Sequence, residues 1–394
     1  MSITIVRIAQ FDGPNRFDPR PGVLAHLRAG RDASEVLRAA LKDAAQRIGL
    51  VIGNLQIERR DTGDDVWHEV FFVTPNLDIG AEALKYVVML LNAQHAGDDT
   101  WDADGLLWDL QKKRRATALP LPALQLIAEA SARGIPTFMR RDGLIQAGYG
   151  ARSATVDPAM LREHASAARA AGSGGVTPPF AQSAASSLLA WDRLGTIPVI
   201  VISGAGRSAP AEAFIARLRQ QRNGVIAALA ASFDAARDCL ADPAAELAVL
   251  DLEPSDLLWR GLPVEQCTVS ALLGLPEPLS SEAGSRDELA RAMGVALLVT
   301  SPGGRAVLNA DDPAILALAE YAPCPLVLIA RSGDHPALRA HRAANGCTLF
   351  LRHTTVVVAC GTSETTVLPA PGDDPWETLL AVALHVAFVE ADTA

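Results

Sequence analysis

A run of mostly β-branched residues that leads into a glycine turn places the strongest constraint on the fold. Residues 197–208 read Ile-Pro-Val-Ile-Val-Ile-Ser-Gly-Ala-Gly-Arg-Ser, and a helical pattern follows from Ala211 to Gln221. A strand, a glycine loop and a helix in this order form the layout of a phosphate-binding loop. Such a loop normally ends Gly-Lys-Ser/Thr, but here Arg207 occupies the lysine position. The stretch therefore predicts the scaffold of a nucleotide site with altered chemistry.

Strand and helix patterns alternate from Gly195 onward. Five apolar runs are strand candidates: 199–202, 247–252, 267–273, 295–300 and 326–330. Alternation at this spacing predicts a mostly parallel sheet that helices cover on both faces. Three further runs predict antiparallel strands near the end, at 348–352, 355–359 and 365–368. Residues 375–390 predict a closing helix.

The N-terminal part shows the patterns of a separate α+β unit. Alternation with period two predicts strands at 2–10, 50–59 and 66–73, the last two as a hairpin. Helical spacing predicts helices at 21–29, 34–48 and 79–93. Residues 121–133 predict a further helix, and 134–150 predict a short strand followed by a hairpin.

Composition changes after Val156, which indicates a domain boundary. An alanine-rich run is followed by Gly172-Ser-Gly-Gly-Val-Thr-Pro-Pro179, which is typical of a linker. We predict an α+β domain at 1–156, a linker at 157–194 and a mostly parallel α/β domain at 195–394. A chain of 394 residues is long enough for two or three domains.

Charge and cysteine usage exclude several classes of function. The net charge of −10 argues against a nucleic-acid or anionic-membrane surface, which would need clustered positive charge. The five cysteines are scattered without a Cys-x-x-Cys pair, so they signal neither a zinc site nor a disulfide framework. No apolar run approaches the roughly 18 residues that a membrane helix needs, and the N-terminus lacks the pattern of a signal peptide. These features predict a cytoplasmic protein.

Two stretches resemble the cyanophycin synthetases, which polymerise aspartate and arginine. Residues 129–150 contain Ala-Arg-Gly-Ile-Pro and end Gln-Ala-Gly-Tyr-Gly, similar to the family's stretch at the start of its ATP-grasp domain. Residues 306–313, Ala-Val-Leu-Asn-Ala-Asp-Asp-Pro, resemble a Mur-ligase signature in the same family's central domain. The resemblance implies a synthetase-like N-terminal domain at 1–156 and a degenerate Mur-ligase-like central domain at 195–394. It also implies that the linker replaces the ATP-grasp domain and that the C-terminal Mur domain is missing.

The family's chemical positions hold other residues in this chain. The metal-binding glutamate corresponds to Asp251, and the active-site lysine corresponds to Met293. An asparagine and an Asp-His pair fall at Gly274 and within 276–280, where no histidine occurs. Since magnesium needs oxygen ligands and ATP needs cationic clamps, the resemblance implies that binding of both is lost. The vestigial nucleotide site consists of Gly204, Gly206, Arg207, Ser208, Asn309 and Asp312. No catalytic and no metal-binding residue is predicted.

The N-terminal domain also departs from the family. Some members carry a Gly-His-x-x-Glu-His helix, whereas the aligned residues 34–39 here contain no histidine. His68 and Glu69 are neighbours on a predicted strand, so their side chains point to opposite faces. We interpret both as structural strand positions.

Two functions of different classes fit these features. The first is a pseudoenzyme that binds an active cyanophycin synthetase and stabilises or regulates it, as an accessory protein in a homo- or hetero-oligomer. The second is a small ATP-dependent ligase of the Mur type, which would form an amide bond on an amino acid or peptide through the altered loop. A carbohydrate or peptide binder is a third alternative. Simultaneous loss of the lysine, the magnesium ligands and two domains favours the pseudoenzyme.

Overall fold

The computed structural model describes residues 2–62, 65–161, 163, 189–221, 227–277, 285–370 and 373–392. The chain divides into two compact units, one formed by residues 1–118 with 259–262 and the other by residues 119–258 with 263–394. Residues 119–156 therefore group with the second unit. The linker predicted at 157–194 falls mostly outside the described residues and stays a prediction.

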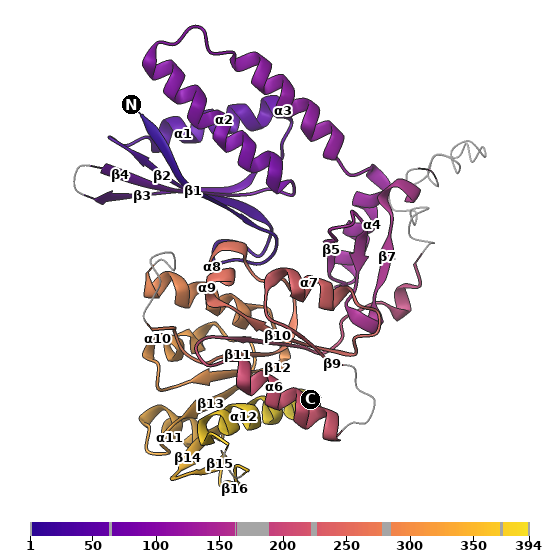
Figure 1. Cartoon of the computed structure of the whole chain (residues 1–394), viewed down its shortest axis with the longest axis vertical. Helices are drawn as coiled ribbons and strands as arrows, with labels where there is room; N and C mark the ends of the chain where they lie inside the picture. Colours follow the sequence, from indigo (N-terminus) through magenta and orange to yellow (C-terminus); the bar gives the residue numbers. More distant parts are fainter. Residues whose placement is uncertain are drawn as a thin grey trace. The chain divides into compact units, whose positions relative to one another are not determined.

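The first unit is a four-stranded antiparallel sheet with helices on one face (Figure 1). The strand order is β1-β2-β4-β3, with β1 Ile3–Phe11, β2 Gly22–Ala29, β4 Asp65–Val73 and β3 Gly53–Thr62. The helices are α1 Ser34–Ile48, α2 Leu77–Ala96 and α3 Ala103–Thr117. The predicted α+β organisation and the predicted hairpin are confirmed, whereas α3 was not predicted.

The apolar stripe of α1 shows why the helices lie on the sheet. Leu37, Leu41 and Ile48 are buried on one face of the helix, as helical spacing requires. Gly49 ends the helix in the left-handed conformation, with φ of 73°. These side chains join the sheet and α2 in one hydrophobic core.

The prediction of a helix at 21–29 is wrong, because these residues form the inner strand β2. Val23 and Leu27 belong to the core beneath the helices, while Leu24 packs on the opposite face with Phe71. A strand that is buried on both faces carries apolar residues at most positions. Its pattern therefore lacks the alternation that distinguishes a half-buried strand from a helix.

The second unit begins with a helix and a small antiparallel sheet. Helix α4 spans Leu121–Ala132, and the strands are β5 Thr137–Met139, β6 Ile145–Ala147 and β7 Ala154–Val156 in the order β5-β6-β7. The hairpin predicted within 134–150 is confirmed. Ala123 and Leu126 of the helix pack against Ile145 and Val156 of the sheet.

The larger part of this unit is a nine-stranded sheet in the order β16-β15-β14-β13-β12-β11-β8-β10-β9. Pairs from β9 to β14 are parallel, and the β14–β15 and β15–β16 pairs are antiparallel. The strands are β8 Val199–Ser203, β9 Ala227–Ala230, β10 Leu247–Leu252, β11 Cys267–Leu272, β12 Thr300–Asn309, β13 Leu326–Ala330, β14 Cys347–Arg352, β15 Thr355–Cys360 and β16 Ser363–Val367. The predicted mostly parallel α/β fold with an antiparallel end is confirmed.

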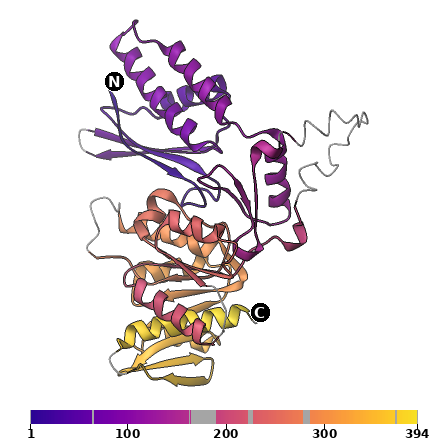
Figure 2. The same ribbon diagram turned by 45° about the vertical axis from the view of Figure 1, so that its right-hand side comes forward.

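Helices cover both faces of this sheet (Figure 1, Figure 2). They are α6 Ser208–Gln221, α7 Phe233–Ala241, α8 Pro254–Arg260, α9 Arg286–Leu298, α10 Pro313–Leu316, α11 Pro336–Ala343 and α12 Pro375–Asp392. On one face α6 and α12 lie side by side, and Phe214 and Phe388 meet with ring centroids 6.0 Å apart. Both rings belong to the central core that the strands complete.

The prediction of a strand at 295–300 is wrong, because α9 continues to Leu298 and β12 begins at Thr300. A capping box between Ser285 and Glu288 fixes the start of α9. The end of the helix is buried at Val295 and Leu297. A short buried apolar run gives the same pattern in a helix and in a strand.

The cysteine spacing signals no disulfide framework, but the structure contains one disulfide. Cys347 and Cys360 face each other across β14 and β15 and are joined as a disulfide. Their separation of 13 residues carries no pairing signal, because only the strand register brings them together. Cys239, Cys267 and Cys324 are free and buried. None of the described helices has both the length and the apolar character needed to cross a membrane.

Candidate functional site: a closed glycine loop

The glycine loop follows β8 near the middle of the nine-stranded sheet. Its parallel neighbours are β11 and β10, so the loop lies at the carboxyl ends of these strands. Ligands of open α/β sheets usually bind at this edge, where the connections diverge. Helix α6 starts directly after the loop at Ser208. The predicted strand, loop and helix are all present.

Gly204 brings the loop into close contact with the end of β11. Its φ is 121°, and a Cβ at this position would lie 2.6 Å from the Gly274 carbonyl oxygen. The Ala205 N–H donates to that oxygen at 3.0 Å, and the Leu273 N–H donates to the Ser203 oxygen at 3.0 Å. The loop is therefore closed against its neighbour by backbone contacts that only glycine permits.

Arg207 turns its guanidinium group toward acidic side chains of the protein itself. Its Nε lies 2.6 Å from Asp251 Oδ1, and its terminal nitrogen pairs with Glu253. Ser208 Oγ donates to Asp251 Oδ2 at 2.6 Å. Asp251 is only 2% exposed. Both oxygens of this buried carboxylate are thus engaged by neighbouring residues of the loop.

These contacts do not fit a magnesium ion. Magnesium binds through oxygen ligands at short distances in a nearly octahedral arrangement. Asp251 is the carboxylate at the corresponding family position, but Arg207 and Ser208 already engage its two oxygens. At Met293, where the resemblance places the active-site lysine, the side chain is fully buried in α9.

Asn309 and Asp312 reach the same edge of the sheet at the end of β12. Asn309 Nδ2 donates to the Leu273 oxygen at 2.7 Å, and Asp312 Oδ2 accepts from the Leu275 N–H at 2.9 Å. Asp312 also caps α10 by accepting from the Ala314 N–H at 3.0 Å. Two side chains of the 306–313 signature thus hold the segment after β11 through hydrogen bonds to its backbone.

The structure brings three of the predicted site residues, Gly204, Asn309 and Asp312, together around Gly274, whereas Arg207 and Ser208 contact Asp251 and a Cβ on Gly206 would meet nothing within 4 Å. A Cβ on Gly274 would lie 3.7 Å from Asp312 Oδ2 and 3.8 Å from Asn309 Nδ2, and Gly204 contacts it from the other side. Sequence reasoning missed Glu253, the second acidic partner of Arg207. Its place directly after a buried strand was the available signal, because side chains there reach the ligand-binding edge.

The other stretch of resemblance, residues 129–150, ends in a structural corner around Tyr149. Tyr149 is fully buried, and its hydroxyl oxygen accepts from the Glu265 N–H at 3.1 Å. Burial raises the pKa of Tyr149 well above its ordinary value. Gly148 and Gly150 have positive φ and approach backbone carbonyls closely. This corner joins the β5-β6-β7 sheet to the nine-stranded sheet.

His68 and Glu69 have separate partners on opposite faces of β4. His68 Nε2 accepts from the Ala33 N–H at 3.0 Å, whereas Glu69 pairs with Arg16 at 2.9 Å and with His26 at 3.0 Å. Burial raises the pKa of Glu69, but the His26 hydrogen bond and the Arg16 charge outweigh this effect and lower it overall. The predicted strand and the opposite directions of the two side chains are confirmed, whereas their interpretation as structural positions stays a prediction.

Comparison with known proteins finds local sequence similarity to cyanophycin synthetases. The chain is 30% identical to the enzyme from Synechocystis sp. and 31% identical to that from Geminocystis herdmanii, each over 109 residues. The aligned part is 27% of this chain and 12% of each relative. The similarity therefore covers only a small part of those enzymes.

Two MurF ligases are among the solved structures that the chain matches. MurF from Acinetobacter baumannii matches with a TM-score of 0.34 and 14% identity over 50% of this chain and 44% of that chain. MurF from Thermotoga maritima in complex with ADP matches with a TM-score of 0.36 and 14% identity over 49% and 45%. The model of the family described as "Domain of unknown function (DUF4938)" matches residues 2–328, and the chain belongs to this family.

Proposed function

We propose that this chain is a catalytically inactive relative of cyanophycin synthetase, and that it binds an active synthetase and stabilises or regulates it. The proposed loss of activity rests on the contacts of Arg207 and Ser208 with the two carboxylate oxygens of Asp251. An internal ion pair occupies the place where a nucleotide site needs a free cation and a free metal ligand.

The charge of the loop opposes a nucleotide. Arg207 contributes one positive charge, whereas its partners Asp251 and Glu253 are both acidic. A triphosphate would therefore meet a site whose cation is already engaged. Releasing Arg207 would leave the buried Asp251 carboxylate without its compensating charge, which is costly. Arginine also does not replace the compact ammonium group of a phosphate-loop lysine.

The partner is proposed from the sequence similarity and the fold. The chain shares a segment with cyanophycin synthetases and keeps an ordered hydrophobic core around the altered loop. Most oligomers pair like surfaces across symmetry axes. A relative that keeps such a surface can pair with an active enzyme and raise its apparent stability by binding the folded form.

Calorimetry with ATP and magnesium tests the inactive state. We expect no heat of binding at ATP concentrations up to about 1 mM and no release of phosphate, because Arg207 and Asp251 engage each other. The MurF ligase from Thermotoga maritima, which is known in complex with ADP, serves as the positive control. A dissociation constant near 1 μM, about −8 kcal/mol, together with hydrolysis would favour the ATP-dependent amide ligase instead.

Co-expression with an active cyanophycin synthetase, such as the enzyme from Synechocystis sp., tests the partner. We expect the tagged chain to retain the untagged enzyme on an affinity column. We also expect the thermal midpoint and polymer yield of the enzyme to rise, because binding favours its folded form. An unrelated tagged protein of similar size and charge is the control. Absence of association, with enzyme yield and stability unchanged, would contradict the proposed partner but not the inactive loop.

A further inference from the structure

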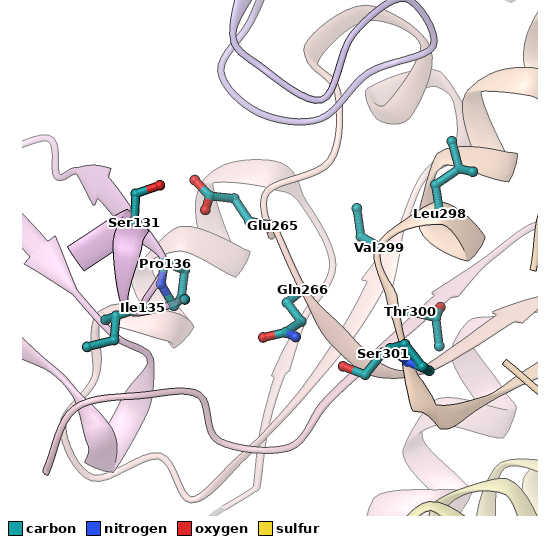
Figure 3. A pocket seen from close by; sticks show the side chains of 11 residues that line it. Ser131, Ile135, Pro136, Glu265, Gln266, Leu298, Val299, Thr300 and Ser301 are labelled. Atoms are coloured by element: carbon teal, nitrogen blue, oxygen red, sulfur yellow. The ribbon is translucent and has the colours of Figure 1, made fainter. Parts of the chain in front are cut away.

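A cavity of about 320 Å³ opens at the edge of the nine-stranded sheet opposite to the glycine loop. It lies where β11 and β12 begin, between the turn after α4 and the junction of α9 with β12 (Figure 3). Pockets for small ligands begin at about this volume. All of its lining residues belong to the second unit.

Glu265 is the only charged residue among the described residues that line the cavity. Within the described part of the chain, its carboxylate has no hydrogen bond and no ion pair. Glu265 is an exposed residue, but nearby protein atoms still raise the pKa of its carboxyl group, and the charge of Arg237 offsets this rise only in part. Figure 3 shows the carboxylate directed toward Ser131 on the α4 side.

The position of Glu265 is fixed by the structural corner described above. Its N–H donates to the hydroxyl oxygen of Tyr149, a fully buried residue. Two residues later Cys267 begins β11. The hydrogen bond to Tyr149 and the start of β11 thus fix the backbone at Glu265, which places its side chain at the mouth of the cavity.

The remaining lining combines polar groups with apolar walls. Gln266 offers an amide oxygen, and Ser131 and Ser301 offer hydroxyl groups from opposite sides of the cavity (Figure 3). Pro136 and Val299 contribute apolar surface. None of the described lining residues is cationic, so a phosphate or carboxylate ligand would find no positive partner in the lining and would be repelled by Glu265.

We propose that this cavity binds an organic cation that carries a guanidinium group on a short aliphatic stem. A guanidinium group can donate two parallel hydrogen bonds to the Glu265 carboxylate and further ones to Gln266. It is more weakly hydrated than an ammonium group, so it suits a cavity with walls such as Pro136. The aliphatic stem packs on the apolar wall.

Calorimetric titration with butylguanidinium chloride tests the site, with butylurea as a neutral planar analogue of the same shape. We expect the purified full-length protein to bind butylguanidinium and not butylurea. The Glu265→Gln variant should bind at least tenfold more weakly, because it loses the charged acceptor but keeps the shape. Glu212→Gln, which alters an exposed carboxylate on α6, should bind like the natural protein.

Three outcomes would overturn the proposal. They are undetectable binding of butylguanidinium at about 10 mM, equal binding of butylurea, and unchanged affinity in Glu265→Gln. Thermal unfolding of Glu265→Gln shows whether the variant is folded. We expect its midpoint to match or exceed that of the natural protein, because the substitution removes a partly desolvated charge.

Discussion

Replacing Arg207 with methionine is expected to lower the free energy of unfolding by about 3–5 kcal/mol, the usual cost of removing one partner of a buried ion pair. The Asp251 carboxylate is 2% exposed and would keep only the hydrogen bond from Ser208. The Arg207 side chain is itself 18% exposed, so solvent can compensate the remaining charge only in part. Urea-induced unfolding followed by circular dichroism measures the change.

A second substitution tests whether the uncompensated charge causes this loss. In the Arg207→Met/Asp251→Asn double variant the buried charge is absent, so we expect most of the stability to return. Arg141→Met is the matched control, because Arg141 is 65% exposed and its two acidic partners, Asp234 and Asp238, are exposed as well. Its cost should stay below about 1 kcal/mol. Equal unfolding of the Arg207 and Arg141 variants would show that the Asp251 contact is not a structural ion pair.

The fold could be predicted from the sequence wherever a hydrophobic pattern is compatible with only one type of secondary structure. The runs at 199–202 and 247–252 lead into helical spacing, which is enough to indicate parallel strands. Strand β2 was misread because Val23 and Leu24 are buried on opposite faces, so its alternation disappears. The end of α9 was misread for a similar reason. Periodicity reports one-sided burial, and it fails where both sides are buried.

The site could be predicted as a group but not in its contacts. The family resemblance grouped residues after β8 and β12 in one site, and in the structure Gly204, Asn309 and Asp312 lie near Gly274 at the carboxyl edge of the parallel strands. The acidic partners of Arg207 could not be predicted, because the pairing depends on the direction of the side chains and on the loop after β10. The Cys347–Cys360 disulfide escaped prediction because it depends on the register of β14 and β15. Both are tertiary facts with no local signal.

Replacing Gly150 with alanine is expected to cost about 3 kcal/mol or more, from the sum of backbone strain and a steric clash. Gly150 has φ of 57°, and a Cβ there would lie 2.3 Å from the Ala245 carbonyl oxygen and 2.6 Å from Ile197 Cδ1. The Ala245 carbonyl already accepts from the Ala151 N–H at 2.8 Å, so it cannot move without losing that hydrogen bond. The thermal midpoint and the yield of folded protein measure the effect.

Gly143→Ala separates the clash from the strain of a positive φ. Gly143 has φ of 80°, but a Cβ there meets nothing within 4 Å. Its substitution should therefore cost only the strain of the left-handed conformation, about 1 kcal/mol. A much larger loss for Gly150→Ala would identify close packing of the Gln146–Gly150 corner as the reason this stretch needs glycine. Similar losses in the two variants would mean that the Ala245 carbonyl gives way, and that the corner is not a rigid joint between the two sheets of this unit.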